Sequence, residues 1–172
     1  MNIKVLSVLS LLVMVFSCKK NQETVEPTTI KPNDSLEIKA KDISKIKYTD
    51  YILDTRVEEK ITHWNYYKEL HEVVNNVKKA DLTYFKNNDK EIRELLINLK
   101  QSIPLEVNSA SVMARITALE TKLLKLESLS NLDTTSKTEL LTTIKEFLVA
   151  FSNFNLQMNK KIENDNIIIE KP

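Results

Sequence analysis

The chain has 172 residues, of which 42% are hydrophobic and 28% charged, a composition that suits one domain with its own core. Its 25 basic and 24 acidic residues nearly cancel, which argues against a nucleic-acid-binding protein, because such proteins usually carry a basic excess. Glycine is absent. This excludes P-loops and dinucleotide-binding fingerprints, which need glycine where the backbone approaches phosphate. It also disfavours β-hairpins, whose tight turns mostly use glycine, so a helical fold is expected.

The first 18 residues, MNIKVLSVLSLLVMVFSC, have the pattern of an export signal. Lys4 supplies a positive charge, and residues 5–16 form an apolar run of signal-peptide length. This run is too short for a membrane-spanning helix, which needs about 20 apolar residues. Residues 1–17 are therefore predicted to be a signal peptide.

The end of this run, Val15-Phe16-Ser17-Cys18, resembles the lipobox of bacterial lipoproteins, with an aliphatic residue three positions before the cysteine and a small one directly before it. The resemblance implies cleavage before Cys18, a diacylglycerol on its sulfur and an acylated amine. Such acyl chains anchor a protein stably, since each buried CH₂ contributes about 0.8 kcal/mol. Cys18 is the only cysteine, so no disulfide framework is expected. An ordinary signal peptide with a chance cysteine, or a cytosolic apolar N-terminus, is the alternative.

The segment of residues 18–47, which begins with the lipidated cysteine, is expected to be a flexible tether. It is polar, contains Pro27 and Pro32, and shows no apolar period. Lys19 and Lys20 stand where surface-exported lipoproteins tend to be acidic. By this resemblance, the protein is expected on the periplasmic face of the outer membrane.

Residues 48–165 show helical periodicity in four stretches, each with apolar residues mostly three and four positions apart. Capping-box patterns open the first stretch at Thr55–Glu58 and the fourth at Ser136–Glu139, and Pro104 ends the second. In chain order, the four apolar faces consist of Val57, Ile61, Trp64, Leu70, Val74 and Val77; Ile92, Leu95, Leu96, Leu99 and Ile103; Val112, Ile116, Leu119, Leu123 and Leu126; and Leu140, Ile144, Phe147, Phe151, Phe154, Met158 and Ile162.

Because each stretch is apolar on one side only, the four faces must be buried against one another, and short connections favour antiparallel neighbours. We therefore predict an all-α fold, an antiparallel bundle of about four helices over residues 48–165. The spacing of the last two stretches also permits a coiled-coil dimer, so a monomer or a weak homodimer is expected. The C-terminal tail, residues 166–172, contains three isoleucines. It either folds back onto the bundle or offers a short strand to a partner.

The most suggestive group of side chains is His63, Trp64, Tyr67 and His71, a candidate face for a ligand or a partner. On one continuous helix, the two histidines would lie about 12 Å apart, too far to share a metal ion, so no metal site is expected. A zinc-protease motif starting at His71 is also incomplete, because Asn75 occupies the place of its second histidine. Alternatively, these residues form the amphipathic rim of the core.

No pattern in the sequence names a reaction, so we expect no enzyme, no catalytic residue and no cofactor. The chain is similar in character to the small Lys-, Asn- and Ile-rich helical lipoproteins of Bacteroidota-type bacteria. We predict a lipid-anchored protein of the cell envelope that acts as an interaction, scaffold or inhibitor-type module. Its expected partners are the membrane, through Cys18, and a protein of unknown identity, with no nucleic acid. The alternative is a periplasmic bundle that binds a small ligand or a metal.

Overall fold

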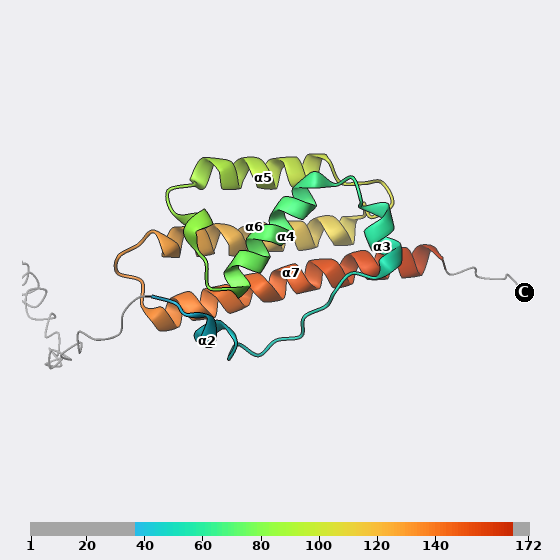
Figure 1. The fold of residues 1–172 in the computed structure, drawn as a ribbon. Helices are drawn as coiled ribbons and strands as arrows, with labels where there is room; N and C mark the ends of the chain where they lie inside the picture. Colours follow the sequence, from blue (N-terminus) through green and yellow to red (C-terminus); the bar gives the residue numbers. More distant parts are fainter. Residues whose placement is uncertain (1–36, 167–172) are drawn as a thin grey trace, which may run out of the picture. The chain divides into compact units, whose positions relative to one another are not determined.

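The computed structural model describes residues 37–166, and these contain six α-helices, one short 3₁₀-helix and no strand (Figure 1). In chain order, the elements are α2 (Ala40–Ile43), α3 (Thr55–Lys60), α4 (Asn65–Lys78), η1 (Thr83–Phe85), α5 (Asp89–Gln101), α6 (Ala110–Ser130) and α7 (Lys137–Asp165). The predicted all-α fold is confirmed. The helices α4 to α7 form the bundle, and α2 and α3 are short additions before it.

The antiparallel pair of α6 and α7 is the central part of the fold (Figure 1). Both helices begin at a serine cap. The hydroxyl oxygen of Ser109 accepts a hydrogen bond from the backbone N–H of Val112, and that of Ser136 accepts one from Glu139, each at 3.2 Å. All apolar residues predicted for the faces of these two helices are buried. Their regular spacing therefore serves packing within one molecule.

The other two long helices complete the bundle. In Figure 1, α5 lies along α6, and α4 crosses between α5 and α7 in the direction opposite to α5. The predicted residues of α5 on the core side, Ile92, Leu95, Leu96 and Leu99, are buried. Phe85 of η1 joins the same core, with its ring edge-on to Phe147 at a centroid distance of 6.3 Å.

The first predicted helix is two helices, α3 and α4, separated by residues 61–64. The hydroxyl of Thr62 donates hydrogen bonds to the carbonyl oxygens of Glu58 and Glu59, each at 3.0 Å. These bonds satisfy carbonyls that the end of α3 leaves free. Trp64 then departs from helical geometry, with ψ at 82°, while its side chain is 2% exposed. The prediction of one continuous helix is wrong because a local side-chain bond and one buried ring interrupt it.

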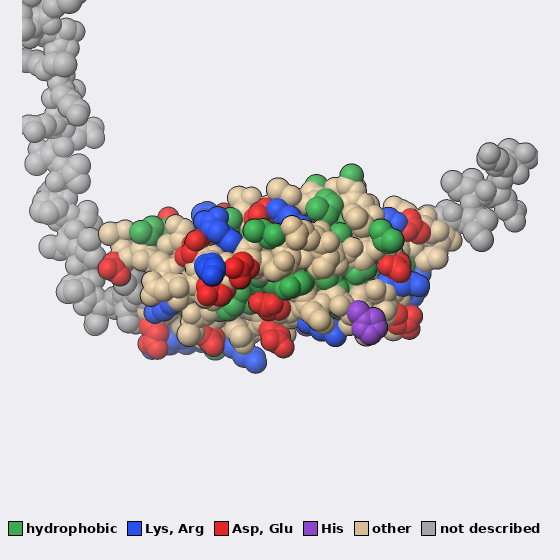
Figure 2. Space-filling model, turned by 90° about the horizontal axis from the view of Figure 1, so that it is seen from above, with side chains coloured by type: hydrophobic (Ala, Val, Ile, Leu, Met, Phe, Trp, Pro, Cys, Tyr) green, Lys and Arg blue, Asp and Glu red, His purple; other side chains and the backbone are tan. Residues whose placement is uncertain are grey.

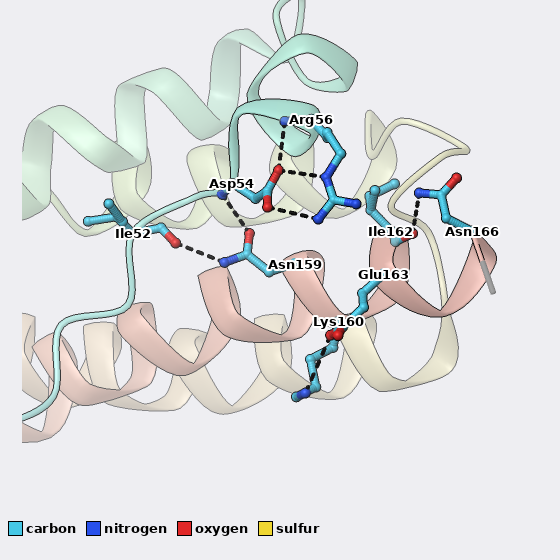
Figure 3. A network of polar contacts seen from close by, with 8 residues as sticks. All are labelled: Ile52, Asp54, Arg56, Asn159, Lys160, Ile162, Glu163 and Asn166. Carbon is cyan, nitrogen blue, oxygen red and sulfur yellow. Dashed lines mark hydrogen bonds and ion pairs between the residues drawn. The ribbon is translucent and has the colours of Figure 1, made fainter.

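The N-terminal cap of α3 is Asp54 and not the predicted Thr55. The Asp54 carboxylate accepts a hydrogen bond at 2.9 Å from the backbone N–H of Arg56 and binds the guanidinium of the same residue (Figure 3). The Arg56 guanidinium, aided by the backbone bond, lowers the pKa of the Asp54 carboxyl to about 2. The predicted capping box was therefore wrong by one position, because the carboxylate at residue 54 supplies the cap.

The turn after α4 shows how a chain without glycine ends a helix. The backbone N–H of Ala80 bonds to the carbonyl of Val77, and that of Asp81 to the carbonyl of Asn76, both at 2.9 Å. These are the two hydrogen bonds of a Schellman motif. Ala80 has a φ of 66°, a left-handed conformation that glycine usually takes. Alanine bears a strain of about 1–2 kcal/mol there.

The packed part of the chain begins before residue 48. Ile38 and Ile43, which lie in the segment predicted to be a tether, are 8% and 6% exposed. The carboxylate of Asp42 pairs with the ammonium of Lys137 at the start of α7, at 2.9 Å. Residues 44–54, here called the strap, then run along α7 towards α3 (Figure 1). Periodicity missed this stretch because its few isoleucines are spaced among polar residues.

Candidate functional site

The structure divides the four predicted site residues between core and surface. His63 lies in the turn between α3 and α4, is exposed, and is separated from α4 by the break in the helix. Trp64 and Tyr67 are 2% and 6% exposed, whereas His71 is exposed on α4. The expectation that His63, Tyr67 and His71 share one helix face is wrong for His63, because the residues around it are not helical.

Trp64 is a core residue. Its indole N–H donates a hydrogen bond to the hydroxyl of Ser102 at 3.1 Å, and its ring lies edge-on to Phe154 with centroids 6.1 Å apart. The Tyr67 ring stacks with it at 5.7 Å and also contacts Phe154, at 6.0 Å between centroids. Because the one polar atom of the indole already has a partner and the ring is enclosed, Trp64 positions α4 on α7 and offers no surface to a ligand.

Tyr67 connects α4, α7 and the strap through Asn155. The phenol of Tyr67 donates a hydrogen bond to the side-chain oxygen of Asn155 at 2.9 Å, and the Asn155 amide nitrogen donates to the carbonyl of Tyr51 at 3.1 Å. Burial raises the pKa of the Tyr67 phenol, so that it stays a protonated donor. Asn155 is 5% exposed, and the Tyr67 and Tyr51 contacts engage both its amide nitrogen and its oxygen.

Ser152, one turn before Asn155 on α7, also binds the backbone of the strap. Its hydroxyl oxygen accepts a hydrogen bond from the N–H of Tyr51 and donates one to the carbonyl of Thr49, both at 2.7 Å. Ser152 is 1% exposed. A single buried hydroxyl thus satisfies two backbone groups that a neighbouring strand would satisfy in a sheet.

Asn159 repeats this arrangement one turn further along α7 (Figure 3). Its side-chain nitrogen donates to the carbonyl of Ile52 at 2.8 Å, and its oxygen accepts from the N–H of Asp54 at 2.9 Å. Ser152, Asn155 and Asn159 are spaced by three and four residues, so they lie on one face of the helix. Together they fix the strap along α7.

A groove with a volume of about 370 Å³ lies between the strap, α3 and α4. Its base consists of three stacked rings, with His71 at 5.9 Å from Phe151 and at 6.2 Å from Tyr67 between centroids. The full lining is Asp50, Tyr51, Ile52, Leu53, Glu58, Ile61, Thr62, Tyr67, Lys68, His71, Lys78, Phe151 and Asn155. The groove therefore contains two of the predicted site residues, Tyr67 and His71.

The wall that the strap contributes is apolar and accessible. Ile52 is 79% exposed and Tyr51 is 38% exposed. Charges of both signs stand at the rim, where Lys78 pairs with Asp50 at 2.7 Å. Lys68 has no ion pair within residues 37–166. An apolar side chain would fit the base, and polar groups beside it would find partners of either sign.

The strap also has backbone N–H groups without a hydrogen-bond partner in the described part of the chain. Within residues 37–166, the N–H groups of Asp50, Ile52 and Leu53 form no hydrogen bond, whereas those of Tyr51 and Asp54 bind α7. These N–H groups could pair with the backbone of another segment.

A larger hollow of about 480 Å³ lies near η1 and the loop between α6 and α7. Its lining includes three carboxylates, Glu37, Asp81 and Asp133, beside Leu82 and Leu140. No aromatic ring contributes to it. The groove is the better candidate site, since it combines aromatic rings in contact, an exposed apolar wall and unpaired backbone N–H groups.

The part of the chain that the structure describes contains no group of three or more His, Cys, Asp or Glu side chains placed to hold a metal ion. None of the helices within residues 37–166 is long and apolar enough to cross a membrane. On the face shown in Figure 2, acidic and basic side chains are interspersed, and hydrophobic ones form small separate groups. Cys18 and most of the C-terminal tail lie outside the described residues.

The strap was not predicted to form a wall of the groove, although the sequence of α7 contains a signal that another segment packs on it. Ser152, Asn155 and Asn159 follow the same helical spacing as the core residues of α7 and border the apolar stripe. Polar side chains in such a position need hydrogen-bond partners, so their spacing indicates contact with another part of the chain. The identity of that segment is not encoded near them.

Comparisons with protein-family models, with curated proteins and with solved structures gave no match. The functional argument therefore depends on the groove and on the N-terminal sequence.

Proposed function

We propose that the protein is a lipid-anchored module of the cell envelope that binds a protein partner in the groove between the strap, α3 and α4. Cys18 would carry the anchor, as its resemblance to a lipobox implies. The proposed location is the outer membrane, facing the periplasm. The role is one of binding, and no step of catalysis is assigned to any residue.

The observation that carries this proposal is the combination, in one groove, of three aromatic rings in contact and a neighbouring segment with unpaired backbone N–H groups. An apolar side chain placed over the exposed ring of His71, beside the small accessible parts of Tyr67 and Phe151, would be partly removed from water. The backbone of the same segment could pair with the N–H of Ile52. This is the recognition mode in which an extended peptide adds to a strand edge and its side chains enter adjacent pockets.

The groove is tested with Ile52→Glu, which puts a charge on its most exposed apolar wall. Ile52 is 79% exposed, so the substitution should leave the fold intact while lowering the affinity for an apolar segment. We expect that a partner cross-linked to the wild-type protein in its own envelope is lost from Ile52→Glu by tenfold or more, as measured by quantitative mass spectrometry.

The matched control is Leu105→Glu, because Leu105 is 85% exposed and does not line the groove. This variant should retain the partner at the wild-type level. Circular dichroism of both variants checks that they remain folded. Equal recovery of the partner with both variants would contradict binding in the groove.

The anchor is tested at Cys18. We expect the wild-type protein to partition into the detergent phase and to carry a diacylglyceryl group on Cys18 in mass spectrometry. In the matched variant, a conventional cleavable secretion signal replaces residues 1–17 and Cys18→Ser removes the sulfur. This protein should appear in the soluble fraction, and its retention in membranes after a high-salt wash would contradict the lipoprotein assignment.

A small amphipathic ligand is the second candidate occupant of the groove. The volume of about 370 Å³ favours it, since ligand sites commonly enclose about 300–1,000 Å³. In that case, a small molecule extracted from the purified wild-type protein should be absent from Ile52→Glu and present in Leu105→Glu. The two candidates therefore use the same pair of variants and differ in what is recovered.

A further inference from the structure

Four lysines close to the start of the described chain, Lys39, Lys41, Lys45 and Lys47, are exposed. We call them the α2 lysine cluster. They alternate with isoleucines that point the other way, because Ile38 and Ile43 are buried and Ile46 packs against the core. The isoleucines hold this segment on the bundle, so the lysines stand on its outer side.

The acidic residues of the same segment do not balance this cluster at the surface. The side chain of Asp42 is 13% exposed and pairs with Lys137 on α7, which lowers the pKa of its carboxyl. Glu37 lies 3.8 Å from the ammonium of Lys39. Lys41, Lys45 and Lys47 form no ion pair within residues 37–166. Several ammonium groups therefore face solvent without a partner, in a chain whose total charge is close to zero.

The position of the cluster along the chain gives these charges a specific counterpart. Lys39 is the described lysine nearest in sequence to Cys18, and residues 19–38 are all that separates the two. Under the proposed function, the anchor holds that end of the chain in a bilayer. The cluster would then be the exposed basic surface of the described bundle that lies nearest to the anchor along the chain.

We propose that the α2 lysine cluster docks on anionic phospholipid headgroups of the membrane that holds Cys18. This inference rests on the proposed lipid anchor, and charge complementarity carries it. Each lysine brought to an anionic surface strengthens binding about fivefold, and the attraction falls off within a Debye length. One acyl anchor and one basic patch would together fix which side of the bundle faces the bilayer.

The test uses the full mature chain with Cys18→Ser, so that no lipid contributes, and measures its sedimentation with phospholipid vesicles. Vesicles of phosphatidylcholine alone are compared with vesicles that contain one-third phosphatidylglycerol, at low and at physiological salt. We expect binding to the anionic vesicles at low salt, weaker binding at physiological salt, and none to phosphatidylcholine. Replacing all four lysines of the cluster with glutamine should weaken binding at least tenfold.

The control variant carries glutamine at four exposed lysines elsewhere, Lys60, Lys90, Lys145 and Lys160. It removes the same charge and should keep at least half of the wild-type binding. An equal loss in both variants would mean that net charge alone acts and would overturn the proposal, as would binding to phosphatidylcholine of equal strength. A negative result in the vesicle assay would not contradict the lipidation of Cys18, since mass spectrometry tests that modification separately.

Discussion

Phe151→Ala is expected to lower the free energy of unfolding by about 3–5 kcal/mol. The Phe151 ring is 2% exposed and stacks with Tyr67 at 6.0 Å and His71 at 5.9 Å. Truncation removes these contacts and leaves a gap beneath the groove, which the packed helices can fill only in part. Denaturant unfolding followed by circular dichroism measures the loss as a shift of the midpoint.

The matched control for this substitution is Leu132→Ala, which shortens a side chain that is 51% exposed. Its unfolding free energy should stay within about 0.5 kcal/mol of the wild-type value. A loss below about 1 kcal/mol for Phe151→Ala would mean that water or a ligand already fills the space under the ring. The phenylalanine would then belong to the binding site and not to the core.

Asn155→Ala is expected to cost about 2–4 kcal/mol, more than an average substitution of a polar residue. The change leaves two groups without their partner, the buried phenol of Tyr67 and the part-buried carbonyl of Tyr51. Each such group costs about 1–3 kcal/mol when water cannot replace the lost bond. The same denaturant unfolding measures the effect.

Asn153→Ala is the control, because Asn153 lies on the same helix, is half-buried, and forms no side-chain hydrogen bond within residues 37–166. It should change stability by less than about 0.5 kcal/mol. A double-mutant cycle adds a second check. Tyr67→Phe should cost less in the Asn155→Ala background than in the wild type, and strict additivity would show that the hydrogen bond between them contributes nothing.

The two longest helices could be read from the sequence because their core residues repeat without interruption. Val112 to Leu126 and Leu140 to Ile162 keep three- and four-residue steps, and the structure buries every residue predicted for both faces. The cap at Ser136 could also be predicted, because its hydrogen bond is local: the serine hydroxyl accepts from the N–H of the third residue after it. Periodicity and local capping decide these elements.

The break in the first predicted helix and the position of the strap depend on contacts that local patterns do not contain. The break at residues 61–64 follows from the hydroxyl of Thr62 and the burial of Trp64, while the apolar spacing continues across it. The strap has no period of its own, because Ser152, Asn155 and Asn159 hold it from a distant part of the chain. Propensity and periodicity over a short window cannot reveal such a segment.

The candidate site could be predicted only in part for the same reason. Tyr67 and His71 line the groove, as their pattern on α4 suggested, but Trp64 belongs to the core and His63 to a separate turn. The wall of the groove comes from the strap, whose position depends on α7. A pattern confined to one helix therefore identified one side of the groove and missed the other.

The hydrogen bonds between the strap and α7 also limit when the strap can pack during synthesis of the chain. Tyr51 and Ser152 are separated by 101 positions along the chain. A ribosome adds about 5–20 residues each second, so α7 is synthesised on the order of ten seconds after the strap. The strap can therefore form these hydrogen bonds only after α7 has been made. Until then, the backbone groups of Thr49, Tyr51 and Ile52 lack the partners that α7 provides.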